Sequence, residues 1–101
     1  MIYLLSFLPD IQDDVIAGYS WYEAKSPGLG EEFIRVFYAC AGEITTNPLV
    51  YPKVYDEFHR CLLRRFPYAV YFHVKDEQIT VFGLFHCARD PRTIKGHLNN
   101  R

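Results

Sequence analysis

One stretch in the second half of the chain decides the fold: Arg60-Cys61-Leu62-Leu63-Arg64-Arg65-Phe66-Pro67-Tyr68-Ala69-Val70-Tyr71-Phe72-His73-Val74. From Tyr68 onward two sets of side chains alternate, and this period of two predicts a β-strand. Pro67 stands at the expected strand start, where its missing backbone donor does least harm. A second alternating run follows after a short polar turn, which indicates a hairpin. We therefore expect strands at about 58–65, 68–75 and 78–86.

The first half of the chain predicts one strand and two helices. Residues 2–8 are mostly apolar and end at Pro9, as in a short strand buried on both faces. Apolar residues then recur at helical spacing from residue 11 to residue 22, before Ser26-Pro27-Gly28 ends the helix. A second helix opens at Gly30 and closes at Asn47-Pro48. The short connection between the helices predicts an antiparallel helical hairpin.

The predicted order is therefore β-α-α-β-β-β, a two-layer α+β domain with an antiparallel sheet packed against a helical hairpin. Residues 51–57 read as a transition with turn character. Both faces of the predicted strands are largely apolar, so we expect one face to meet the helices and the other to meet something outside the chain. Residues 1–92 form the predicted domain. Residues 93–101 read as a basic, polar tail without an apolar stripe, either a short helix or disordered.

Composition narrows the class of protein. The chain has 101 residues, of which 50% are hydrophobic and 17% aromatic, enough for one ordered domain. No apolar run approaches the roughly 18–20 residues of a membrane span, and the N-terminus lacks the features of a signal peptide. Cys40, Cys61 and Cys87 form no close pair in the sequence, which argues against a disulfide framework and a zinc site. We expect a cytoplasmic protein with no cofactor and no metal.

The charges are unevenly distributed along the chain. Residues 1–57 carry nine acidic and three basic residues, whereas residues 58–101 carry three acidic and eight basic residues and all four histidines. This asymmetry fits a basic face that meets an acidic or nucleic-acid partner, or two halves that attract each other across the fold.

Two groups of residues in the basic half are candidates for chemistry. Arg64 and Arg65 could grip a phosphate or carboxylate, or form ion pairs with Asp56, Glu57 or an acid of the first helix. His86 and Arg89 at the end of the last strand could shuttle a proton and clamp phosphorane charge in RNA cleavage. The alternative for His86 is a structural imidazole bonded to the backbone.

Three other residues have simpler interpretations. Asp90, before Pro91, could make a turn or pair with Arg89 or Arg92. His59 and His73 are expected to be exposed on their strands.

Several motifs, in order, resemble the RelE/ParE superfamily of toxins. Trp21-Tyr22-Glu23 followed by Pro27-Gly28-Leu29-Gly30 and Glu32-Phe33 is similar to the opening of these toxins. The resemblance continues through Asn47-Pro48, Tyr51-Pro52, Arg64-Arg65-Phe66-Pro67-Tyr68 and His86-x-x-Arg89-Asp90-Pro91, and it covers roughly residues 3 to 92.

This resemblance implies the toxin of a bacterial type II toxin–antitoxin pair. Such a growth inhibitor is neutralised by a cognate antitoxin, whose DNA-binding part carries the pair to operator DNA. RelE-like members are ribosome-dependent mRNA endoribonucleases, and ParE-like members poison DNA gyrase without being hydrolases. A further alternative is a non-toxic binding module with the same fold.

The resemblance also assigns residues. If the chain is a ribonuclease, His86, Arg89 and Arg65 are the catalytic candidates. However, Ala69 stands where RelE-type enzymes carry another arginine, Ala88 replaces an arginine, and no tyrosine follows Tyr71. These departures favour the ParE-like branch, with the target- or antitoxin-binding residues Arg60, Arg64, Tyr68, Tyr71 and Arg92.

Overall fold

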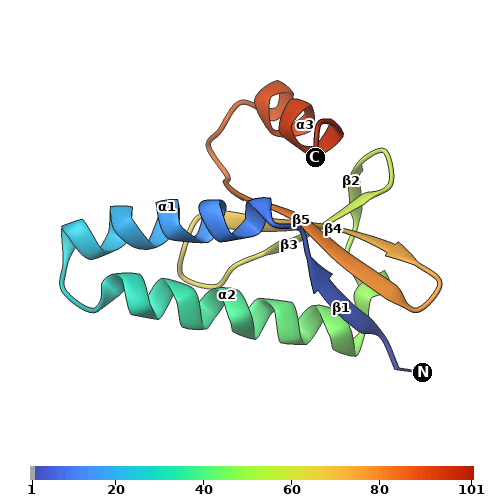
Figure 1. Cartoon of the computed structure of the whole chain (residues 1–101), viewed down its shortest axis with the longest axis horizontal. Helices are drawn as coiled ribbons and strands as arrows, with labels where there is room; N and C mark the ends of the chain where they lie inside the picture. Colours follow the sequence, from blue (N-terminus) through green and yellow to red (C-terminus); the bar gives the residue numbers. More distant parts are fainter. Residues whose placement is uncertain (1) are drawn as a thin grey trace.

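The computed structural model describes residues 2–101, which form a five-stranded sheet with helices on both faces (Figure 1). In chain order the elements are β1 (Leu4–Phe7), α1 (Asp10–Lys25), α2 (Leu29–Thr46), the 3-10 helix η1 (Pro48–Val50), β2 (Lys53–Tyr55), β3 (Phe58–Leu62), β4 (Tyr68–Lys75), β5 (Gln78–His86) and α3 (Pro91–Asn99). The α+β class and the predicted β-α-α-β-β-β order are confirmed, with β2 and α3 added. No helix within these residues is long and apolar enough to cross a membrane.

The sheet is mixed rather than wholly antiparallel. Its strand order is β1-β5-β4-β3-β2, and β1 runs parallel to β5 with Leu5 opposite Ile79. The helical hairpin that follows β1 is a long crossover connection. Parallel pairing requires such a connection, whereas a tight turn would allow only antiparallel pairing. At the opposite edge, Lys53 pairs with His59, so part of the predicted turn at 51–57 is a strand.

The expectation that the first strand is buried on both faces is wrong. β1 is an edge strand, and Leu4 is 57% exposed while Phe7 is 39% exposed. A short apolar run does not distinguish a central strand from an edge strand, because both can be apolar without alternation.

The sharp turn between α1 and α2 is built by Glu23. Its carboxylate accepts hydrogen bonds from the backbone N–H groups of Gly28 and Gly30, each at 3.0 Å. These donors have no partner within the helix at its first turn, so the carboxylate caps α2. A side chain at residue 30 would place Cβ 2.8 Å from the carbonyl oxygen of Tyr19, and glycine permits this close approach.

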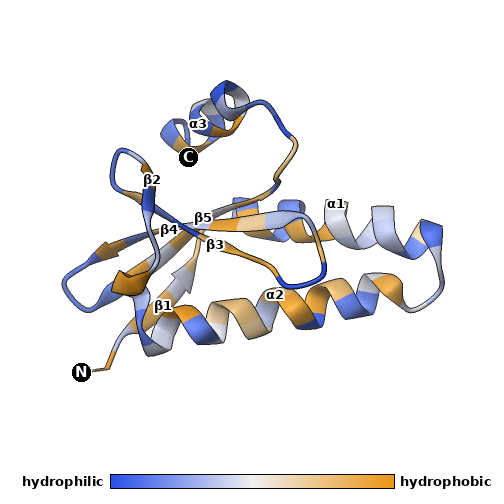
Figure 2. Cartoon of the chain, turned by 180° about the vertical axis from the view of Figure 1, so that it is seen from behind, coloured by the Kyte–Doolittle hydropathy of each residue, from blue (hydrophilic) through white to orange (hydrophobic). Residues whose placement is uncertain are grey.

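The main core lies between the helical hairpin and one face of the sheet. Figure 2 shows apolar positions recurring along α2 and the strands. Aromatic rings dominate this core, and Phe33 packs 5.3 Å from Tyr22 and 4.9 Å from Tyr68 between ring centroids. Its other buried members include Ile11, Phe37, Cys40, Ile44, Cys61, Val70, Phe72, Ile79 and Val81.

Neither strand histidine expected at the surface is fully exposed. His59 is 5% exposed, and its Nδ1 lies 2.8 Å from the carbonyl oxygen of Tyr51. His73 is half-buried between Phe58 and Phe82, with ring centroids 4.0 and 4.4 Å away. Both imidazole rings pack against phenylalanine rings of neighbouring strands, and this packing keeps them from being fully exposed.

The second face of the sheet is covered by α3, part of which was read as a tail without an apolar stripe. Ile94 and Leu98, one turn apart, are 2% and 1% exposed and pack in one cluster with Ala69 and Phe85. The short-helix alternative for this tail is confirmed. The expected absence of an apolar stripe is wrong, because a stripe of only two residues is too short to stand out in the sequence. The packing of α3 also corrects the expectation that this face meets only something outside the chain.

The start of α3 explains the Asp90-Pro91 pair. The Asp90 side chain accepts the backbone N–H of Arg92 at 2.8 Å and also pairs with its guanidinium, while Pro91 occupies the first helical turn. This is a standard N-cap, and it confirms the predicted pairing of Asp90 with Arg92.

The last residue is fixed to the first helix. Arg101 donates to both carboxylate oxygens of Asp14, at 2.6 and 3.0 Å, and to the carbonyl oxygen of Phe82 at 3.0 Å. Asp14 also accepts the backbone N–H of Leu84 at 3.1 Å. The two charged side chains are only 12% and 11% exposed. This network joins α1, β5 and the C-terminus.

The packing of the hairpin predicts opposite effects for two glycine substitutions. Gly18→Ala would place Cβ 2.5 Å from the Phe33 ring, and we expect it to lower the free energy of unfolding by about 1–3 kcal/mol. Gly42→Ala lies in open space on α2 and should raise that free energy by about 0.5–1 kcal/mol. Urea unfolding measures both, and two changes of the same sign would contradict the packing.

The Asp14–Arg101 pair predicts a second stability effect. Arg101→Gln leaves a largely buried carboxylate without its cation, and we expect a loss of about 2 kcal/mol in the free energy of unfolding. Lys53→Gln is the matched control, because it removes the same charge from an exposed pair with Glu57. Its cost should stay below about 0.5 kcal/mol. Equal losses for the two variants would show that Arg101 does not hold the C-terminus.

Candidate functional site

Three of the predicted residues meet where β4 begins and β5 ends. Tyr68 and His86 are directly opposite each other across the two strands, with ring centroids 5.2 Å apart in a T-shaped arrangement. Arg89 lies in the turn that follows β5, and its backbone N–H donates to the carbonyl oxygen of His86 at 3.1 Å. Its guanidinium carbon lies 5.4 Å from the centre of the Phe85 ring.

The hydrogen bonds and burial of this cluster set its chemistry. The backbone N–H of Ala88 donates to Nδ1 of His86 at 3.0 Å, so the neutral ring carries its proton on Nε2. Burial raises the pKa of Tyr68, while the nearby charge of Arg89 acts in the opposite direction. Tyr68 therefore stays a neutral phenol that can donate a hydrogen bond at ordinary pH. The bond to Ala88 agrees with the structural interpretation of His86.

A small hollow of about 80 Å³ separates the cluster from α1. Ala17 and Gly18 form its floor on the helix, and Asp14 lies at its side. The volume corresponds to about three water molecules in the liquid, so the hollow is too small to enclose a nucleotide. The carboxylate of Asp14 is already bonded to Arg101 and Leu84, so it is not placed to orient His86.

Arg64 and Arg65 do not join this cluster. Arg65 pairs with Glu32 at 2.6 Å and Arg64 pairs with Glu43 at 3.2 Å, both on α2. The sequence anticipated ion pairs but placed the acids at Asp56, Glu57 or the first helix. The arginines lie in the loop that leads back over the hairpin, which brings them to the second helix instead.

The remaining predicted residues lie on the α3 side of the sheet or beside it. Tyr71 is 2% exposed and stacks on Tyr55 at 6.0 Å between centroids. Burial raises its pKa, and the half-buried Arg60 lies near enough to counter part of this effect. Arg92 is exposed at the start of α3. Among the five predicted binding residues, Tyr71 alone has almost no surface to offer.

The arrangement lacks a complete acid–base set. His86 and Arg89 line the same hollow, and Arg65 is paired elsewhere. Ala69 is fully buried beneath Ile94 and Leu98, so an arginine would not fit at that position with α3 in place. Within residues 2–101, no group of three or more His, Cys, Asp or Glu side chains is placed to hold a metal ion.

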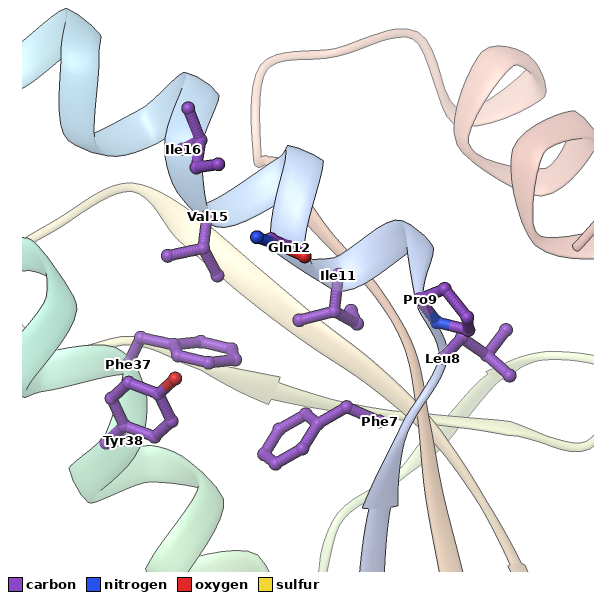
Figure 3. A pocket seen from close by; sticks show the side chains of 9 residues that line it. All are labelled: Phe7, Leu8, Pro9, Ile11, Gln12, Val15, Ile16, Phe37 and Tyr38. Atoms are coloured by element: carbon purple, nitrogen blue, oxygen red, sulfur yellow. The ribbon is translucent and has the colours of Figure 1, made fainter.

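A larger apolar groove lies between β1 and the two long helices. Its volume is about 460 Å³, and its lining carries no charged side chain. Figure 3 shows Ile11 and Val15 of α1 pointing toward Phe7 of β1 and Phe37 of α2. Ile16 and Tyr38 lie further out among the lining residues. Ile16 is 51% exposed and Tyr38 is 58% exposed. The groove therefore offers apolar surface beside the sheet edge formed by β1.

The chain shares its fold with a protein of a toxin–antitoxin system. A solved structure described as "Chromosomal ParDE TA system from P. aeruginosa" contains a chain with a TM-score of 0.76. The match covers 84% of this chain and 96% of that chain, at 16% sequence identity. No family model and no curated protein matches the sequence. The likeness shows that the two chains share a fold.

Sequence reasoning missed both the groove and the Asp14 network. Asp14 was read only as an acid favouring the start of a helix, and its role depends on Arg101, 87 residues away. The small residues Ala17 and Gly18 were a usable signal, because small side chains on a helix mark close approach of another element. The exposed apolar positions Ile16 and Tyr38 were hidden among the many apolar residues of the helices.

Proposed function

We propose that this chain is the toxin of a bacterial type II toxin–antitoxin pair and that it acts in the cytoplasm as a protein-binding growth inhibitor. The proposal rests on the ordered RelE/ParE-like motifs together with the fold shared with a ParDE chain. DNA gyrase is the proposed target. Operator DNA would be contacted only through the antitoxin.

The observation that carries the binding role is the uncharged groove beside the β1 edge. Within the described residues β1 pairs only with β5, so its other edge can accept hydrogen bonds from an added strand. An amphipathic antitoxin segment could lay its apolar side over Ile16 and Tyr38. The exposed Arg64 and Arg92 and the half-buried Arg60 and Tyr68 are then proposed contacts for target or antitoxin outside the groove.

A ribosome-dependent endoribonuclease is the second candidate, and the hollow that His86 and Arg89 share favours it. An imidazole and a guanidinium in one site can move a proton and balance developing phosphate charge. The pairing of Arg65 with Glu32 and the burial of Ala69 under α3 weigh against it, because the hollow then lacks a third catalytic group.

Gyrase supercoiling measured with the purified chain tests the proposed function. We expect loss of supercoiling of relaxed plasmid, or accumulation of cleaved DNA, in proportion to the added protein. Normal supercoiling at saturating protein would contradict a gyrase target.

Primer extension on cellular mRNA after induction separates the second candidate. If the chain is a ribonuclease, new 5′ ends should appear and should vanish with Arg89→Ala. Lys95→Ala is the control, because it removes an exposed positive charge from α3. The gyrase proposal expects no new ends from any of these proteins.

A further inference from the structure

Two cysteines far apart in the sequence meet inside the protein. Cys40 lies on the inward stripe of α2, and Cys61 lies on β3 opposite Val70. Their Sγ atoms are 2.7 Å apart, and the two residues are 5% and 3% exposed. The sequence shows no close pair because 21 positions separate them. The third cysteine, Cys87, is exposed and supplies a comparison.

The surroundings give the two thiols different roles. The pKa of Cys61 is lowered because the thiol of Cys40 donates to its sulfur, with a smaller contribution from Tyr51. The pKa of Cys40 is raised, first by the same hydrogen bond and then by burial. The directions agree with a hydrogen-bonded pair in which Cys61 gives up its proton more readily than Cys40. A thiolate is the form that reacts with oxidants.

A small hollow leads from the surface to Cys40, whose sulfur lies 2.7 Å from that of Cys61. Its volume is about 110 Å³, and Cys40, Leu62 and Arg64 line it together with Glu43. Arg64 and Glu43 form an exposed ion pair at its rim. The space corresponds to about four water molecules, which admits a small oxidant such as hydrogen peroxide but excludes a peptide-sized disulfide.

The geometry points to Cys40 and Cys61 as a dithiol that hydrogen peroxide oxidises to an intramolecular disulfide. The Cys61 thiolate attacks one peroxide oxygen, the O–O bond breaks, and hydroxide leaves to give a sulfenic acid. Cys40 then loses its proton and attacks the Cys61 sulfur, so the S–S bond forms and the second hydroxide leaves. The protons released by the two thiols convert both hydroxides to water. Two thiols and one peroxide thus yield one disulfide and two waters.

This modification is independent of the toxin role. The bond would fix α2 to β3 and restrict the unfolded chain between the two cysteines. We expect the melting temperature of the oxidised protein to rise by roughly 5–15 °C, because cross-links of this span stabilise small domains. A reducing agent should reverse the change.

Mass spectrometry of a Cys87→Ser variant tests the proposal, because only the paired cysteines remain. The reduced protein is treated with hydrogen peroxide, denatured, and labelled with N-ethylmaleimide. We expect a mass loss of two hydrogens, no label, and a peptide pair joining residues 40 and 61 that dithiothreitol separates. Two labels per chain at a peroxide dose that oxidises Cys87 in the unchanged protein would overturn the proposal. Links only between separate chains would overturn it as well.

Single substitutions in the Cys87→Ser background test the order of events. Cys40→Ala should stop the reaction at a sulfenic acid on Cys61, which dimedone traps. Cys61→Ala should leave Cys40 largely unoxidised, because the hydrogen bond that defines the pair is gone. Circular dichroism checks that each variant is folded, and Cys40→Ser and Cys61→Ser provide a second pair of variants if alanine impairs folding. Equal trapping at both positions would contradict the assignment of Cys61 as the thiolate.

Discussion

The carboxylate of Asp14 is the point on which the arrangement of the molecule depends. It joins α1 to the backbone of β5 through Leu84 and to the end of the chain through Arg101. With Arg101 held, α3 remains over the second face of the sheet and buries Ala69 and Tyr71. The same network closes the inner side of the hollow beside His86.

Features set by local sequence were predictable. The strands at 68–75 and 78–86 have the bounds expected from alternation, and His86 lies near Arg89 because only a short turn separates them. The motif containing Glu23 and Gly30 now has a structural reason, since its carboxylate caps the second helix and its glycine admits a neighbouring helix. Part of the family resemblance therefore reflects how the hairpin is built.

Features set by distant contacts were not predictable. The partners of Arg64 and Arg65 on α2, the contact between Cys40 and Cys61, and the pairing of Arg101 all depend on how the elements are placed in space. The packing of α3 on the sheet was not predictable for a different reason. The apolar face of this helix consists of two side chains, Ile94 and Leu98. The helix is stabilised by their packing against the sheet rather than by its intrinsic helix propensity. The edge position of β1 likewise follows from topology, not from composition.

These constraints lead to a protein that offers a binding groove more clearly than a catalytic centre. Hydrogen exchange of the chain, alone and with the proposed antitoxin, tests this claim most directly. We expect added protection in β1, in the first half of α1 and around Phe37 and Tyr38, with α3 unchanged. Protection confined to β4, β5 and α3, or release of α3 on binding, would contradict the account.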